Sequence, residues 1–96
     1  MIENLIVYFV SFEKYNTLPI DRGTNNAPIT KNGVDYLPGD IVCWNLGGAI
    51  THIGIVVNQK STDGLRNLIV HNIGEGQVLA DCLFSYKIIG HYSFQK

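Results

Sequence analysis

The second half of the chain alternates short apolar runs with polar turns, a pattern typical of β-strands. The run 51–58 opens with Thr51-His52, continues with β-branched and apolar residues, and ends at Asn58. The run 68–72 (Leu-Ile-Val-His-Asn) carries its histidine, His71, at the opposite end. Glycine and proline turns separate these runs from their neighbours. Strands are therefore expected over 41–45, 51–58, 68–72 and 87–94, with a short extended piece at 78–79.

The N-terminal segment 3–15 has a helical spacing of its apolar residues. These residues are Leu5, Ile6, Phe9 and Phe12. Glu3 at the start and Lys14 at the end complement a helix dipole, so the pattern favours a helix over 3–15. Several β-branched and aromatic residues within the segment keep a strand open as an alternative, namely Val7, Tyr8 and Val10.

A long connection over 16–38 follows, rich in asparagine, glycine and proline. Within it, Asn32-Gly33 favours a tight turn and a small hairpin. Residues 80–86 favour one or two helical turns. Together these patterns predict a single α+β domain over 1–96, in which an N-terminal helix and a long loop precede an antiparallel sheet of about four to five strands at 40–94.

Composition and charge exclude several classes of function. The chain is 46% hydrophobic and 16% charged, which is typical of a folded domain and not of a disordered segment. A formal net charge of -1 and the lack of a basic run argue against a nucleic-acid partner. No stretch is long enough to span a membrane. The apolar run 5–10 lacks the basic flank and cleavage site of a signal peptide, so localisation stays undetermined.

The two strand histidines are the candidate chemistry of this sequence. If 51–58 and 68–72 form an antiparallel hairpin, the start of one strand meets the end of the other, and His52 and His71 become directly opposed neighbours. Two adjacent imidazoles can divide the roles of base and orienter, as in nucleophilic catalysis. The alternative is a pair of structural histidines. We expect no cofactor and no metal, because no spacing typical of metal ligands accompanies them. His91 is expected to be structural.

The two cysteines, Cys43 and Cys82, lie in apolar runs and are expected to be free thiols. Reactive cysteines prefer a helix N-terminus, where the dipole lowers the thiol pKa. Neither cysteine clearly has that setting. The residues alone therefore predict a base without an evident nucleophile, and leave open whether Cys43 or Cys82 serves as one.

The order of these motifs resembles the strand half of NlpC-type cysteine peptidases of the papain-like clan. It is more similar still to a bacterial family of domains of unknown function, number twelve-eighty-seven. The resemblance covers most of the chain, including its opening residues 3–9. The similar motifs are 37–46 (Leu-Pro-Gly-Asp-Ile-Val-Cys-Trp-Asn-Leu), 52–56 (His-Ile-Gly-Ile-Val), 70–76 (Val-His-Asn-Ile-Gly-Glu-Gly), 83–84 (Leu-Phe) and 89–92 (Ile-Gly-His-Tyr).

This resemblance implies a cell-wall-directed cysteine peptidase or amidase, with His52 as base and His71 as orienter. The nucleophile of NlpC-type enzymes lies on a helix that precedes the matched region, so this chain is expected to be a truncated domain, inactive alone. A non-catalytic peptide or cell-wall binding module, or an assembly-dependent protein, is the alternative. A peptide or peptidoglycan ligand, a homo-oligomer or partner chain covering the sheet, and a cell-envelope or secreted setting are further expectations.

Overall fold

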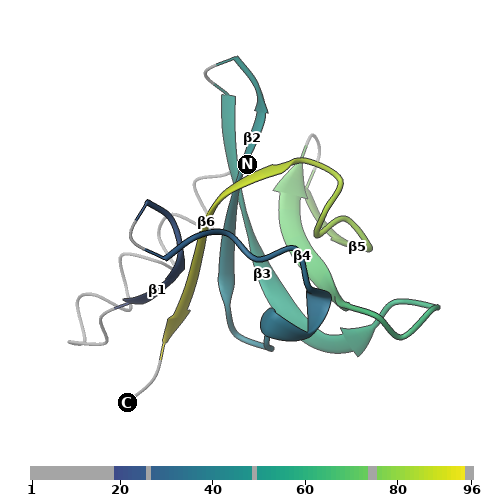
Figure 1. Ribbon diagram of the computed structural model, residues 1–96. Helices are drawn as coiled ribbons and strands as arrows, with labels where there is room; N and C mark the ends of the chain where they lie inside the picture. The colour runs from purple at the N-terminus through teal and green to yellow at the C-terminus, as the bar shows by residue number, and fades with distance from the viewer. Residues whose placement is uncertain (1–18, 26, 49, 74–75, 95–96) are drawn as a thin grey trace.

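A computed structural model describes residues 19–25, 27–48, 50–73 and 76–94. These residues form one antiparallel sheet of six strands in the order β1-β6-β2-β3-β4-β5 (Figure 1). The strands are β1 (Pro19–Gly23), β2 (Ile41–Gly47), β3 (Ile50–Lys60), β4 (Asn67–Ile73), β5 (Gly76–Ala80) and β6 (Lys87–Phe94). A 3-10 turn, η1 (Gly33–Asp35), lies between β1 and β2.

The expected α+β class is wrong, because the described residues form an all-β fold whose helical content is the single turn η1. The helix expected over 3–15 lies outside the described residues. The sheet has six strands, not four or five, because the expected loop 16–38 contains β1. A strand this short is stabilised mainly by its partner, and β1 pairs with β6 from the far end of the chain.

The pairing of the central strands decides which side chains share a face. In the β2–β3 hairpin, Trp44 lies opposite His52 and Val42 lies opposite Gly54. On the other side of β2, Val42 lies opposite His91 of β6. Because side chains alternate between the two faces of a sheet, the side chains of Trp44, His52 and His71 lie on the same face.

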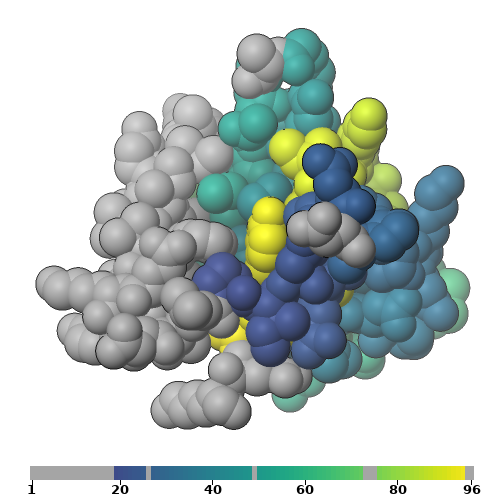
Figure 2. Space-filling view, turned by 60° about the vertical axis from the view of Figure 1, so that its left-hand side comes forward, coloured from purple at the N-terminus to yellow at the C-terminus, as the bar shows by residue number. Residues whose placement is uncertain are grey.

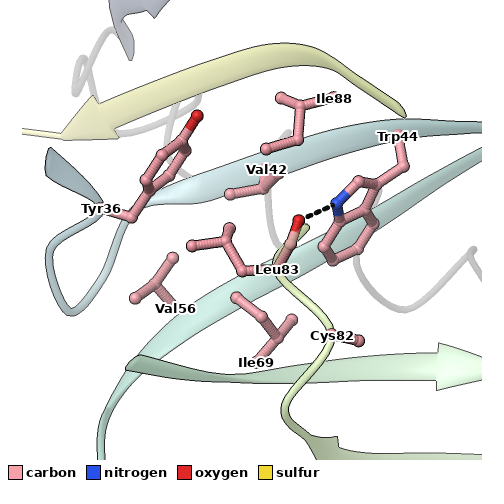
Figure 3. Close-up of a cluster of buried hydrophobic side chains, with 8 residues drawn as sticks. All are labelled: Tyr36, Val42, Trp44, Val56, Ile69, Cys82, Leu83 and Ile88. Atoms are coloured by element: carbon pink, nitrogen blue, oxygen red, sulfur yellow. Dashed lines mark hydrogen bonds between the residues drawn. The ribbon is translucent and has the colours of Figure 1, made fainter. Parts of the chain in front are cut away.

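The hydrophobic core packs on this face (Figure 3). Its central member is Trp44, which is fully buried and donates a hydrogen bond from its indole Nε1 to the backbone oxygen of Leu83 at 2.9 Å. This bond ties the segment between β5 and β6 across the core. The remaining buried members of the cluster are Tyr36, Val42, Val56, Ile69, Cys82, Leu83 and Ile88.

Two expected local structures are also corrected. Residues 80–86 fold as the end of β5 and a turn, in which the amide of Ser85 donates to the oxygen of Cys82 at 3.0 Å. Asn32-Gly33 opens η1 and not a hairpin, because the Asn32 side chain accepts a hydrogen bond from the amide of Val34. Pairing at Asn32-Gly33 would also compete with the packing of Gly33 against the backbone of Leu65.

Candidate active site

The two histidines expected to meet do lie in contact. His52 is the third residue of β3 and His71 the fifth residue of β4. Their imidazoles are joined by a hydrogen bond of 2.8 Å between His52 Nε2 and His71 Nδ1. The rings meet edge to face, with an interplanar angle of 81° and centroids 5.0 Å apart. The catalytic roles assigned to them from the sequence stay a prediction.

The register that produces this contact differs from the directly opposed pair that we expected. His71 lies opposite Gly54, so His52 is its diagonal neighbour, two residues along β3. Diagonal neighbours on one face of a sheet are about 7–8 Å apart, which two long side chains can bridge. Gly54, which lies opposite His71, places no side chain between the two histidines.

Gly54 also makes room for Trp44. A Cβ atom added at position 54 would lie 2.5 Å from Trp44 Cη2 and 2.5 Å from Ile69 Cγ2. The indole therefore crosses directly over the backbone of β3 at Gly54. A lone glycine in a β-branched strand marks such a close approach, and this signal could have identified the Trp44–Gly54 contact from the sequence.

The indole of Trp44 lies against both histidines. It is nearly parallel to the His52 ring, with centroids 5.9 Å apart and an interplanar angle of 24°. Its contact with the His71 ring is edge to face at 6.0 Å. Since the indole is itself held by the Leu83 oxygen, Trp44 fixes the orientation of the histidine pair. Sequence reasoning did not assign this role to Trp44.

Burial makes both histidines weaker bases than histidine in water. His52 is 4% exposed and His71 is 3% exposed. Loss of hydration lowers the pKa of His52, and it lowers the pKa of His71 together with the repulsion of His52. At neutral pH both rings are therefore uncharged, and one donates the single hydrogen that they share.

The shared hydrogen decides which nitrogen can act as a base. If His52 carries its hydrogen on Nε2 and donates it to His71 Nδ1, then His52 Nδ1 holds a free lone pair. A proton accepted at Nδ1 would give an imidazolium that still donates from Nε2 to His71. His71 is thus placed to hold the tautomer and the orientation of His52.

Neither cysteine of the chain belongs to this pair. Cys43 and Cys82 are free thiols, as expected, and among the described residues neither makes a hydrogen bond to His52 or His71. Cys43 alternates with Trp44 on β2, so it faces away from the histidines. Burial raises the pKa of Cys43 to about 11, and burial with the nearby Asp81 raises that of Cys82 to about 11.

The third histidine has a partner that the sequence did not indicate. His91 Nε2 lies 2.6 Å from Asp40 Oδ2, and both side chains are buried. The ring of Tyr36 stacks on His91, with centroids 4.1 Å apart. Asp40 Oδ2 also accepts the backbone amide of Leu37, which closes the turn before β2. The structural role expected of His91 stays a prediction, and its Nδ1 atom is buried without a hydrogen-bond partner among the described residues.

The described part of the chain contains no cluster of three or more histidine, cysteine or acidic residues that could hold a metal ion. It also contains no helix long and apolar enough to cross a membrane.

Comparison of the sequence with known proteins assigns the chain to a family. The family described as "Domain of unknown function (DUF1287)" matches residues 2–94. The chain is 41% identical over 73 residues to "Uncharacterized protein YijF" of Escherichia coli (strain K12), an alignment that covers 76% of this chain. It spans only 35% of the length of that relative. No solved structure matches the chain. This protein belongs to the DUF1287 family.

Proposed function

We propose that the chain carries the base-bearing half of an NlpC-type cysteine hydrolase site directed at cell-wall peptides. His52 is the general base and His71 the residue that orients it. The observation that carries the proposal is the buried 2.8 Å hydrogen bond between His52 Nε2 and His71 Nδ1. A base held neutral at physiological pH, with its tautomer fixed by a second polar group, suits the activation of a nucleophile.

The proposed reaction begins when His52 Nδ1 takes the proton of a thiol. The thiolate attacks the carbonyl carbon of an amide, and the imidazolium returns its proton to the departing amine. Water, activated in turn by His52, then attacks the thioester carbonyl; the acyl–sulfur bond breaks, the acyl group leaves as a carboxylic acid, and His52 returns its proton to the thiolate. Throughout these steps His71 Nδ1 accepts the hydrogen bond from His52 Nε2 and keeps Nδ1 directed at the reacting atoms.

The thiol is proposed to lie outside the residues of this chain. The chain has two cysteines, and both are described, carry a pKa of about 11 and lack a hydrogen bond to the pair. The chain by itself is therefore proposed to be inactive towards amides. This arrangement also predicts that a small thiol added in solution can take the place of the missing nucleophile.

The experiment is thiolysis of a p-nitrophenyl ester of an N-acetylated peptide in the presence of 2-mercaptoethanol, followed by release of nitrophenolate. The chain should accelerate the reaction beyond an equal concentration of free imidazole. The acceleration should disappear in His52→Gln and fall in His71→Gln, with a changed pH profile. A matched control is Gln59→Ala, an exposed position on the same strand, which should behave as the parent chain.

The proposal is wrong if the parent chain and His52→Gln give the same rate. A second assay distinguishes a binding module from a catalyst. It measures binding of a cell-wall peptide by Trp44 fluorescence. Saturable binding of equal affinity in the parent chain and in His52→Gln would identify a non-catalytic binding module. The high thiol pKa of both cysteines is the observation that favours this second function.

A further inference from the structure

A second polar site lies on the same face of the sheet, at the edge formed by β1 and β6. A cavity of about 610 Å³ opens there, next to the η1 turn and the start of β2. Figure 2 shows the dark blue residues of β1 packed beside the yellow residues of β6 on this side of the molecule. The polar residues that line the cavity are Arg22, Thr30, Asp35, Asp40, His91 and Ser93.

Arg22 enters the cavity through an irregularity in β1. Asp21 pairs with Tyr92 and Gly23 pairs with His91, so Arg22 is an extra residue without a paired residue on β6. Bulges of this kind redirect a side chain. Here the guanidinium Nε donates to the Ser93 hydroxyl at 2.8 Å. The bulge therefore brings a cation and a hydroxyl together at the cavity wall.

The charge of Arg22 is not neutralised by any described carboxylate. The nearest acid in sequence, Asp21, is occupied by the amide of Gly23 and the hydroxyl of Thr24. No ion pair involves Arg22 within the described ranges, where the salt bridges join Arg66 to two aspartates and His91 to Asp40. Within the described residues, the Nη groups of Arg22 have no carboxylate partner.

The cavity also contains a carboxylate without a cation. Asp35 accepts a hydrogen bond of 2.6 Å from the Thr30 hydroxyl, but the described residues supply no positive partner for it. Asp40 differs, because His91 and the amide of Leu37 both bind its Oδ2 atom. One guanidinium and one carboxylate, neither with a described partner of opposite charge, therefore line the same space.

A buried ring nitrogen completes this set. His91 is 1% exposed and lines the cavity, and its Nδ1 atom has no partner among the described residues. The other ring nitrogen, Nε2, is committed to Asp40. Buried polar atoms are nearly always satisfied, so Nδ1 requires a hydrogen-bond partner.

We propose that this cavity binds a small zwitterion, either a free amino acid or a short peptide. The ligand carboxylate binds the guanidinium of Arg22 and the hydroxyl of Ser93. The ligand ammonium binds Asp35 and supplies the hydrogen-bond partner that His91 Nδ1 lacks. A ligand that carries both charges neutralises both walls, whereas an anion alone leaves Asp35 unpaired and a cation alone leaves Arg22 unpaired.

The test is an NMR titration of the full chain at pH 7 with four separate probes: alanine, alanyl-alanine, acetate and ethylamine. Alanine or alanyl-alanine should give saturable shifts at the amides of Arg22, Asp35 and Ser93. Acetate and ethylamine, each of which carries one half of the zwitterion, should bind at least tenfold more weakly. Tighter binding of alanine identifies a free amino acid as the ligand, and tighter binding of alanyl-alanine identifies a peptide.

Two variants and a control connect the binding to the cavity. Arg22→Gln and Asp35→Asn should each weaken binding of the better probe at least tenfold, about the loss of one charged hydrogen bond. Asparagine at position 35 keeps an acceptor for Thr30. Lys31→Gln, a nearby cation outside this cavity, should change nothing. Equal affinity for acetate and alanine, unchanged binding in folded Arg22→Gln or Asp35→Asn, or no saturable shift at all overturns the proposal.

Discussion

Replacement of Gly54 by alanine should disturb the fold and the histidine pair together. The added Cβ would lie 2.5 Å from both Trp44 Cη2 and Ile69 Cγ2, about 0.9 Å closer than the 3.4 Å at which ordinary contact begins. Trp44 and Ile69 lie on different strands, and the added Cβ would be too close to both side chains. Both must therefore shift or the backbone must move, and the indole is restrained by its hydrogen bond to the Leu83 oxygen.

The cost can be assembled from the structure. Overpacking of a well-packed core costs about 1–3 kcal/mol. Loss of the hydrogen bond from Trp44 Nε1 to the Leu83 oxygen adds about 1 kcal/mol. Alanine regains about 0.5–1 kcal/mol because the unfolded chain is less flexible than with glycine. We expect the free energy of unfolding to fall by about 1–3 kcal/mol, a large part of the 5–15 kcal/mol typical of a domain.

Urea unfolding followed by the fluorescence of the single tryptophan, Trp44, measures this change. With a slope of about 1–3 kcal/mol per molar urea, the midpoint should fall by roughly 1 M. Because the indole lies on His52, the imidazole NMR signals of His52 and His71 should shift as well.

The control is Gly90→Ala, a buried strand glycine whose added Cβ would meet the ring of Tyr92 at 2.9 Å and not Trp44. This variant should leave the signals of His52 and His71 unchanged. If Gly54→Ala unfolds at the same urea concentration as the parent chain and the imidazole signals do not move, Gly54 does not position Trp44 and our account of the site is wrong.

Three further predictions concern the buried histidines, the buried thiols and the association of the chain. The folded-state pKa values of His52 and His71 lie below the unfolded value, so the unfolded chain binds more protons. Stability should therefore fall as the pH drops below about 6.5, by at most about 1.4 kcal/mol per pH unit for each histidine. Urea titrations at several pH values test this, and the same dependence of stability on pH in the double variant His52→Gln/His71→Gln would contradict it. Cys43 and Cys82, each with a pKa of about 11, should be alkylated by iodoacetamide only at alkaline pH, independently of His52→Ala; fast labelling at pH 7 in an intact-mass assay would instead show a thiol coupled to the base. The chain should associate with itself or with a partner in light scattering, whereas a strict monomer at high concentration that binds no hydrophobic dye would refute this.

The sequence predicted the strands well where the signal was local. The run 87–94 matches β6, and the runs around His52 and His71 match β3 and β4. Even the short extended piece at 78–79 lies within β5. The contact between His52 and His71 followed from their places at the start and end of two adjacent strands. Its register did not, because His71 lies opposite Gly54 and not opposite His52, and no residue in the sequence marks that register.

Features that depend on distant residues could not be predicted in this way. The strand β1 contains both proline and glycine and reads as a loop until β6 is placed beside it. Gly33 suggested a hairpin turn, but an added Cβ there would lie 2.4 Å from the oxygen of Leu65, so close packing against a distant loop accounts for the residue. Similarly, residues 80–86 form a turn whose Leu83 oxygen accepts a hydrogen bond from Trp44, almost forty positions earlier, and the local sequence does not indicate this contact.

The two histidine sites on this face differ in what their partners permit, and this difference supports His52 as the base. His91 has a carboxylate at 2.6 Å, so its Nε2 is committed to Asp40 and a charge on the ring would be neutralised in place. His52 has a second imidazole as its partner, which can accept one hydrogen but repels a second charge. The pair can therefore gain one proton without repulsion between two charged rings, and that proton can be passed on again. The His52–His71 pair suits transfer of a proton, whereas the His91–Asp40 pair suits a fixed support for the turn before β2 and for the adjoining cavity.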